Sequence, residues 1–175
     1  LYVLDWTYAG CPTLAGVRRI EPSMGTYCAE FVTTTLEKQL ALDAAPLLIV
    51  NRLSFYTRGN NQQAGDPSLD KPVISFSGLA ANAPDSVVLS QFRQRLIDTA
   101  CEFARRRPTY LLRPIPEMPR DVPRTMARAL LLGDRERVSI PLSEYHQRHR
   151  FVWDAQDAAR AQCGVQILDP LPFLC

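Results

Sequence analysis

Residues 109–123, TYLLRPIPEMPRDVP, decide the fold that this sequence predicts. The stretch opens with a short apolar run between two prolines, residues 109–112, which predicts a buried strand. A loop with four prolines follows, at positions 114, 116, 119 and 123, and it carries Glu117 and Asp121. In open α/β sheets, loops at the carboxyl ends of strands form the rim of the ligand crevice. A simpler alternative is that the prolines only shape a turn into the next helix.

Apolar runs and helical patterns alternate on both sides of this stretch. Strands are predicted at 1–6, 47–50 and 165–168, with a brief one at 73–76, and helices at 26–43, 85–107, 122–132 and 143–162. The run at 47–50 is apolar throughout, which is typical of a central parallel strand covered by helices. Connections of this length favour parallel strands with right-handed crossovers. We therefore predict an α/β fold, a three-layer α/β/α sandwich with a mostly parallel, flavodoxin-like sheet.

Two long segments lack a regular pattern. Residues 7–25 contain Gly10, Cys11 and Pro12 and are predicted to form a loop. Residues 57–85 form a second turn-rich segment with several glycines, prolines and asparagines. Long loops inside compact domains are usually functional or disordered, so the second segment is treated as an insert of unassigned role.

Length and composition restrict the class of protein. The chain has 175 residues, which suits one domain, and 46% of them are hydrophobic, so it can bury a sizeable core. Its formal net charge of +2 is too small to indicate nucleic-acid binding. It contains no run of about 18 apolar residues, so no membrane-spanning helix is predicted. Because the chain begins within one predicted strand and ends just after another, we expect a single domain over 1–175 that is incomplete at both ends.

Five cysteines leave at least one without a partner inside the chain. Cys11 lies in a Gly-Cys-Pro loop and Cys28 begins a predicted helix, with 16 residues between them. A disulfide that closed a loop of this size would contribute on the order of 3 kcal/mol and would suit an oxidising compartment. Cys101 and Cys163 fall in helical patterns and are expected to be small buried hydrophobes. Cys175 is expected to be half of a bridge whose partner lies outside the chain.

Polar residues follow the predicted strands at the edge where ligands bind in this type of fold. Asn51 directly follows the run at 47–50, and its amide could donate a hydrogen bond to an oxyanion. Gly10 lets the backbone approach a ligand closely, and its N–H could be a second donor. Arg52 could hold a carboxylate or another anionic group, and Glu117 lies in the loop after the central strand. The competing interpretation is that Asn51 only satisfies backbone groups at the end of its strand.

The sequence contains no complete catalytic group. His146 and His149 are the only histidines and share a helix face at i and i+3, so a metal pair is conceivable. Their neighbours are Gln147, Arg148 and Arg150, with no carboxylate beside them to orient an imidazole, so a solvated helix face is the better interpretation. The cysteine spacings do not suit zinc, and no metal site is predicted. The chain has no G-x-S-x-G, P-loop or G-x-G-x-x-G motif, so it supplies hydrogen-bond donors without a nucleophile or base.

Several short motifs occur in the order found in one known family. AGCPT at 9–13, followed by CAEF at 28–31, resembles a "CP … C-x-x-F" region, and LLIVNRLSFY at 47–56 resembles a strand ending in Arg-Trp, although Leu53 replaces the tryptophan. LLRPIPEMPRDVPRTMAR at 111–128 is similar to a "P-I-P-E … v-P … a-R" stretch, and VQILDPLPFLC at 165–175 resembles a closing "D-P … C" motif. Together they resemble the SGNH (GDSL-like) domains fused to type-3 membrane acyltransferases, which O-acetylate bacterial surface polysaccharides such as the O-antigen of lipopolysaccharide. The resemblance covers the chain except for 57–85.

The resemblance implies an SGNH-hydrolase-like fold and acyl transfer through a serine acyl-enzyme. In the family the nucleophilic serine lies in a Gly-Asp-Ser motif, which is expected on a strand before Leu1. The family's aspartate and histidine lie in an Asp-x-x-His motif, which is expected beyond Cys175 and would also supply that cysteine's partner. No catalytic residue is therefore expected within this chain. The family's oxyanion positions fall on or near Gly10 and Asn51, although the usual G-x-N-D signature is absent and Arg52 could matter more.

The resemblance also implies where the domain works and with what. It implies a periplasmic domain of an inner-membrane protein, fused to a membrane acyltransferase domain that passes on the acetyl group of a donor, with a carbohydrate acceptor and no bound cofactor. In that compartment a disulfide between Cys11 and Cys28 is expected. Two other functions stay open, a non-catalytic carbohydrate-binding or scaffold domain and a stand-alone SGNH esterase, because a fold alone does not determine a function.

Overall fold

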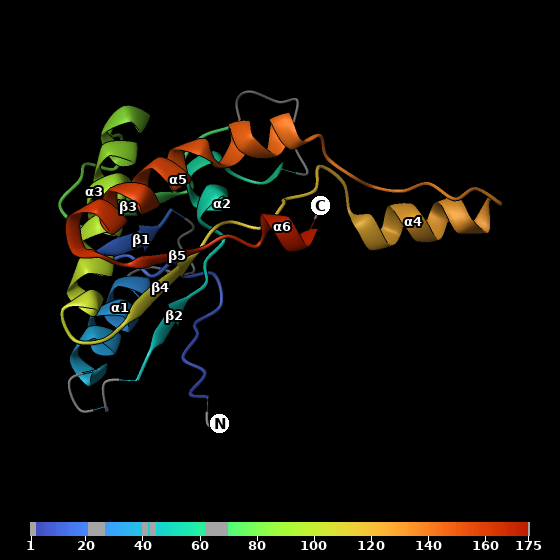
Figure 1. Ribbon diagram of the computed structural model, residues 1–175. Coiled ribbons are helices and arrows are strands. Elements are labelled where there is room, and N and C mark those ends of the chain that lie inside the picture. The colour runs from blue at the N-terminus through green and yellow to red at the C-terminus, as the bar shows by residue number, and fades with distance from the viewer. Residues whose placement is uncertain (1–2, 21–26, 40–41, 43–44, 62–69, 175) are drawn as a thin grey trace.

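The computed structural model describes residues 3–20, 27–39, 42, 45–61 and 70–174 (Figure 1). A parallel sheet of three strands forms its centre: β2 (Leu47–Ile49), β4 (Thr109–Leu112) and β5 (Gln166–Leu168), in the order β2-β4-β5. Leu111 of the central strand lies opposite Ile49 on one side and Ile167 on the other. The predicted α/β fold with a parallel sheet flanked by helices is therefore confirmed.

Two long helices, α3 (Asp85–Ala104) and α5 (Leu142–Cys163), pack against each other and against one face of the sheet (Figure 1). The rings of Phe92 and Phe151 meet between them, with their centroids 5.9 Å apart. On the other face of the sheet, Leu48, Val50 and Leu168 are exposed in the described part of the chain. The prediction that 47–50 is a central strand covered by helices is therefore wrong for the described residues, because β2 lies at one edge of the three-stranded sheet. The core between the two helices and the sheet is almost wholly apolar, because burial of apolar surface drives this packing; its members include Leu53, Val88, Phe92, Leu96, Ile97, Ala100, Leu111, Val152, Ala155, Ala159 and Val165.

A separate antiparallel pair consists of β1 (Val17–Arg19) and β3 (Ile74–Phe76), in which Val17 lies opposite Phe76. The brief strand predicted at 73–76 is confirmed. The prediction of a loop throughout 7–25 is wrong at β1, because Val17 is fully buried and pairs with a strand far away in the sequence. The predicted strand at 1–6 is also wrong over residues 3–6, where Val3 and Leu4 are exposed. Residues 1 and 2 lie outside the described residues.

Four shorter helices complete the described part of the chain: α1 (Tyr27–Lys38), α2 (Leu53–Arg58), α4 (Val122–Leu131) and α6 (Leu171–Leu174). The Asp121 side chain caps α4 by accepting a hydrogen bond from the N–H of Arg124 at 3.0 Å. Gly164 ends α5 with a φ of 73°, which favours glycine. The sequence did not predict α2, because six residues are too few to show a helical period. None of the described helices is both long and apolar enough to cross a membrane.

Two disulfides join described residues of the fold. The predicted bridge between Cys11 and Cys28 is present and ties the loop before β1 to α1. Cys101 and Cys163 are also bridged, so their interpretation as free buried hydrophobes is wrong. These cysteines are separated by 62 residues, but the packing of α3 on α5 brings their Cα atoms to 5.4 Å. A loop of this length implies a contribution of about 4 kcal/mol through the unfolded state. The predicted role of Cys175 lies outside the described residues.

Candidate functional site

The carboxyl ends of the three parallel strands lie at one edge of the sheet, called here the rim. Asn51 and Arg52 follow β2, and the proline loop with Glu117 follows β4. Tyr145 of α5 holds this loop, because its hydroxyl donates a hydrogen bond to the Pro114 carbonyl at 2.8 Å. The rim is therefore built from segments that lie far apart in the sequence and are fixed to one another by side chains.

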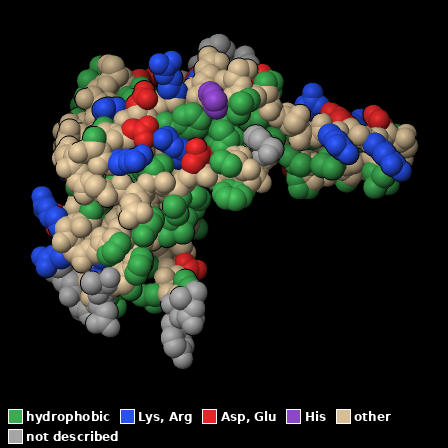
Figure 2. Space-filling model, viewed as in Figure 1, with side chains coloured by type: hydrophobic (Ala, Val, Ile, Leu, Met, Phe, Trp, Pro, Cys, Tyr) green, Lys and Arg blue, Asp and Glu red, His purple; other side chains and the backbone are tan. Residues whose placement is uncertain are grey.

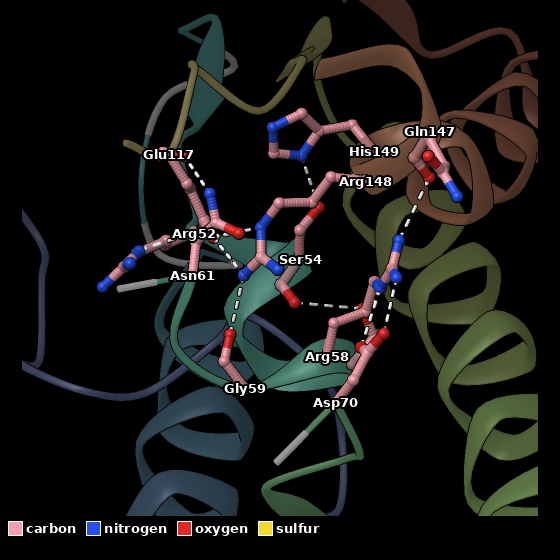
Figure 3. Close-up of polar contacts among 11 residues, drawn as sticks. Arg52, Ser54, Arg58, Gly59, Asn61, Asp70, Glu117, Gln147, Arg148 and His149 are labelled. Atoms are coloured by element: carbon pink, nitrogen blue, oxygen red, sulfur yellow. Dashed lines mark hydrogen bonds and ion pairs between the residues drawn. The ribbon is translucent and has the colours of Figure 1, made fainter. Parts of the chain in front are cut away.

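Glu117 pairs with two arginines at the rim, and Glu117, Arg52 and Arg148 are called here the Glu117 cluster (Figure 3). Its side chain is only 3% exposed, and its two carboxylate oxygens face different arginines. Nε of Arg52 donates to Oε1 at 3.0 Å, and Nε of Arg148 donates to Oε2 at 2.7 Å. The Arg148 guanidinium also donates to the Gly59 carbonyl at 2.7 Å, and the Asn61 amide donates to the Glu117 carbonyl. One buried carboxylate thus pairs with two guanidinium groups, so the Glu117 cluster has a net positive charge.

Arg52 is the member of this cluster that reaches solvent. Its side chain is 52% exposed, whereas that of Arg148 is 10% exposed. The Arg52 guanidinium also lies over the Phe55 ring, 4.9 Å from the centroid, which adds a cation–π contact. Glu117 and Phe55 therefore fix the direction of Arg52 while leaving much of the group open to an anionic ligand.

Asn51 binds the loop that contains Cys11 rather than standing free. Its Oδ1 accepts a hydrogen bond from the Thr13 N–H at 2.6 Å, and its Nδ2 donates to the Thr13 hydroxyl at 3.0 Å. These contacts agree with the competing interpretation from the sequence, in which Asn51 satisfies backbone groups near the end of its strand. A side-chain amide has two N–H donors, so one of them is still left for an oxyanion.

Gly10 lies in the same loop, three residues before Thr13, so the Asn51–Thr13 contacts attach its loop to the rim. Gly10 has a φ of 76°, a conformation that favours glycine, and its carbonyl accepts a hydrogen bond from Arg19 at 3.2 Å. The disulfide between Cys11 and Cys28 closes this loop on its other side. The structure thus brings Asn51, Arg52 and Glu117 to one edge and links the Gly10 loop to it.

Two hollows occur among the described residues, and neither is a substrate-sized pocket at the rim. Beneath Asn51, a cavity of about 20 Å³ is lined largely by apolar side chains, including Leu96 and Leu111, and this is close to the space of a single water. A larger hollow of about 320 Å³ is lined by Arg160 and residues 164–167, and it lies where β5 begins, away from the rim.

The structure places the two histidines in different environments, one of them exposed and the other buried. His146 is exposed as expected, but His149 is completely buried, so the interpretation of both as a solvated face is wrong for His149. The reason is that α5 packs on α2, where Nδ1 of His149 and the Ser54 hydroxyl lie 2.6 Å apart. Burial, helped by the nearby Arg148 and Arg58 charges, lowers the pKa of His149 to about 4. No group of three metal-ligating side chains occurs among the described residues.

Ser54 and His149 have the residue types of a nucleophile and a base, yet their place in the fold rules out that role. Both side chains are fully buried, so no substrate carbonyl can reach the Ser54 hydroxyl. The pair instead joins α2 to α5. A second contact nearby does the same: Arg58 pairs with Asp70 at 2.6 Å and donates to the Gln147 carbonyl. The hydrogen bond from Arg58 lowers the pKa of Asp70.

Sequence reasoning missed the residues that support the rim. Arg148 looked like part of a solvated helix, and Thr13 and Tyr145 were not singled out. One signal was present: a buried carboxylate such as Glu117 needs a positively charged partner. That rule states that a cation is required, but with 20 lysines and arginines in the chain it does not identify which one.

Comparison with known proteins places the chain in a family. The family model of the SGNH domain fused to AT3 domains matches residues 1–175, the entire chain. No curated protein and no solved structure gives a significant match. The match agrees with the order of the strand-end motifs and with the parallel sheet of the structure. The chain therefore belongs to the family of SGNH domains that are fused to AT3 domains.

Proposed function

We propose that this domain transfers an acetyl group to a hydroxyl of a bacterial surface polysaccharide, such as the O-antigen of lipopolysaccharide. The observation that carries the proposal is the family: the match is to SGNH domains joined to AT3 domains, which associates this domain with an acyltransferase. The rim supports it, because Asn51 and Arg52 present an amide and a guanidinium at the edge where this fold type binds ligands.

The proposed reaction has two steps. A serine oxygen attacks the acetyl carbonyl, the negative charge moves to the carbonyl oxygen, and the acyl-enzyme forms as the donor group leaves. A sugar hydroxyl then attacks the acyl-enzyme, and the serine leaves with its proton restored. The serine, aspartate and histidine are proposed to come from parts of the protein outside residues 1–175. Residues of this chain, Asn51 and the Gly10 loop, would hold the oxyanion.

Arg52 and Glu117 are proposed to orient the acceptor. The net positive charge of the Glu117 cluster suits a negatively charged group on the acceptor sugar or beside it. The membrane acyltransferase domain is proposed to deliver the acetyl group from its donor. The two disulfides favour a periplasmic location, since disulfides persist in oxidising compartments.

The proposal is tested in the whole protein, in cells from which the native copy has been removed. Surface polysaccharide is isolated, and its O-acetyl content is measured over time by NMR. Asn51→Ala is expected to slow acetylation by about 10²-fold, the scale for loss of one oxyanion donor. Arg52→Ala is expected to reduce it as well. Asn82→Ala and Arg93→Ala, which change exposed residues of the same types away from the rim, are the matched controls.

Two results would contradict the proposal. If both rim variants acetylate at the wild-type rate, this edge takes no part in the reaction. If the isolated 175-residue chain gives a burst of product from an activated acetyl ester, and the burst disappears when one of its serines is changed, the nucleophile lies within the chain and a stand-alone esterase becomes the better explanation. Wild-type thermal stability of the variants would exclude unfolding as the cause of any loss.

A further inference from the structure

Helix α4 projects from the body of the domain as an arm, with residues 133–141 returning alongside it (Figure 1). Ala129 is the buried residue of this helix, and it contacts the returning chain, where the Asp134 N–H donates to its carbonyl at 2.9 Å. Of the other residues of this helix, Val122 and Thr125 are partly buried and the remainder are exposed. The arm lies apart from the sheet and from the rim, so its surface is not explained by the proposed reaction.

The arm exposes a stripe of large apolar side chains. Met126 is 44% exposed, Leu130 is 71% exposed and Leu131 is 87% exposed. Met126 and Leu130 are one turn apart on the helix, and Leu132, also exposed, continues the apolar surface past the helix end. Isolated exposed leucines are common, but contiguous ones on a projecting helix mark an interaction surface.

Basic side chains border this stripe. Arg124 and Arg128 are one turn apart, both exposed, and neither forms an ion pair with a described residue. Figure 2 shows hydrophobic side chains gathered along one side of the arm with basic side chains next to them. Within 120–137 there are five arginines against three acidic residues, and Arg120 is already paired with Glu136 at 2.6 Å. The unpaired charge on the arm is therefore mainly positive.

From these observations we propose that α4 lies on the surface of a lipid bilayer with negatively charged headgroups. An amphipathic helix of this type sinks its apolar side chains to the acyl boundary while its arginines stay among the headgroups. A protein partner would also cover the apolar stripe, but the row of unpaired arginines along its border suits the dense negative charge of anionic headgroups. The family supports the location, because AT3 domains are membrane acyltransferase domains in the same polypeptide. The inference does not depend on the acyl-transfer chemistry.

Vesicle flotation of the purified 175-residue chain tests the proposal directly. Vesicles of pure phosphatidylcholine are compared with vesicles that contain phosphatidylglycerol as well. The chain should float with the anionic vesicles and much less with the neutral ones. Binding should weaken as salt is raised from 0.1 M to 1 M, since the screening length falls from about 10 Å to about 3 Å.

Variants separate the apolar and the charged contributions. Changing Leu130 and Leu131 together to Glu should weaken binding by about 100-fold or more, because each leucine contributes a factor of about ten when buried. Arg124→Gln should weaken binding to anionic vesicles by about fivefold and leave binding to neutral vesicles unchanged. Val87→Glu and Arg93→Gln, exposed positions on α3, are the controls and should bind as wild type does. Because all of these side chains are exposed, the variants should keep the wild-type melting temperature.

Three results would overturn the proposal. The first is an absence of flotation with anionic vesicles. The second is a dimer in analytical ultracentrifugation that disappears in the Leu130 and Leu131 variant, which would make a second copy the occupant of the stripe. The third is a photo-crosslinker at Met126 in the whole protein that attaches to the membrane domain and not to lipid.

Discussion

Acidification should destabilise this domain through His149. In the folded protein the pKa of His149 is about 4, against 6.5 for an unperturbed histidine, because the ring is buried beside two arginines. Between these two values the unfolded chain binds a proton that the folded protein does not bind. The free energy of unfolding therefore falls as the pH drops below 6.5, and the His149 contribution levels off below pH 4.

The size of the effect follows from the two pKa values. At pH 4.5 the His149 contribution should be about 2 kcal/mol less than at pH 7. This is a large part of the stability of a typical domain, which is about 5–15 kcal/mol. Solvent screens this effect little, because the His149 side chain is completely buried.

Urea unfolding at pH 7 and pH 4.5, followed by circular dichroism under non-reducing conditions, measures this loss. Other groups also titrate in this range, among them Asp70, whose pKa is lowered by Arg58. The useful quantity is therefore the difference between wild type and His149→Gln. On acidification the free energy of unfolding of wild type should fall by about 2 kcal/mol more than that of His149→Gln. The exposed control His146→Gln should lose the same amount as wild type. Equal losses in wild type and His149→Gln would mean that the folded protein protonates His149 normally, and the reasoning from burial would be wrong.

The remaining predictions concern the Glu117 cluster and the disulfides. Glu117→Gln should destabilise the domain by about 3 kcal/mol in urea unfolding, because it leaves the largely buried Arg148 without its carboxylate. Glu136→Gln, in an exposed ion pair, should cost less than 1 kcal/mol, and equal costs would show that burial does not strengthen the Glu117 cluster. Changing Cys101 and Cys163 together to Ala should cost about 4 kcal/mol. Thiol titration of the denatured, unreduced 175-residue chain should find one reactive cysteine, and five reactive cysteines would refute both bridges.

The candidate site was predicted in part. The strand-end rule selected Asn51, Arg52 and Glu117 from the sequence, and the structure brings them to one edge because parallel strands end on the same side. The rule does not reveal which atoms are already occupied. The Asn51 Oδ1 already accepts a hydrogen bond from the Thr13 N–H, and one Asn51 N–H donates to the Thr13 hydroxyl. The Arg52 Nε–H already donates to Glu117. Those partners depend on how distant loops meet, which no local pattern encodes.

The sequence by itself determined the strands of the parallel sheet and the long helices, because apolar runs and helical periods are local properties of a chain. Tertiary structure alone decided the burial of His149 against Ser54, the bridge between Cys101 and Cys163, and the pairing of Arg148 with Glu117. The physical reason is the same in each case. A helix period shows which residues share a face, but only the packing of α5 on α2, on α3 and on the loop after β4 shows what that face meets.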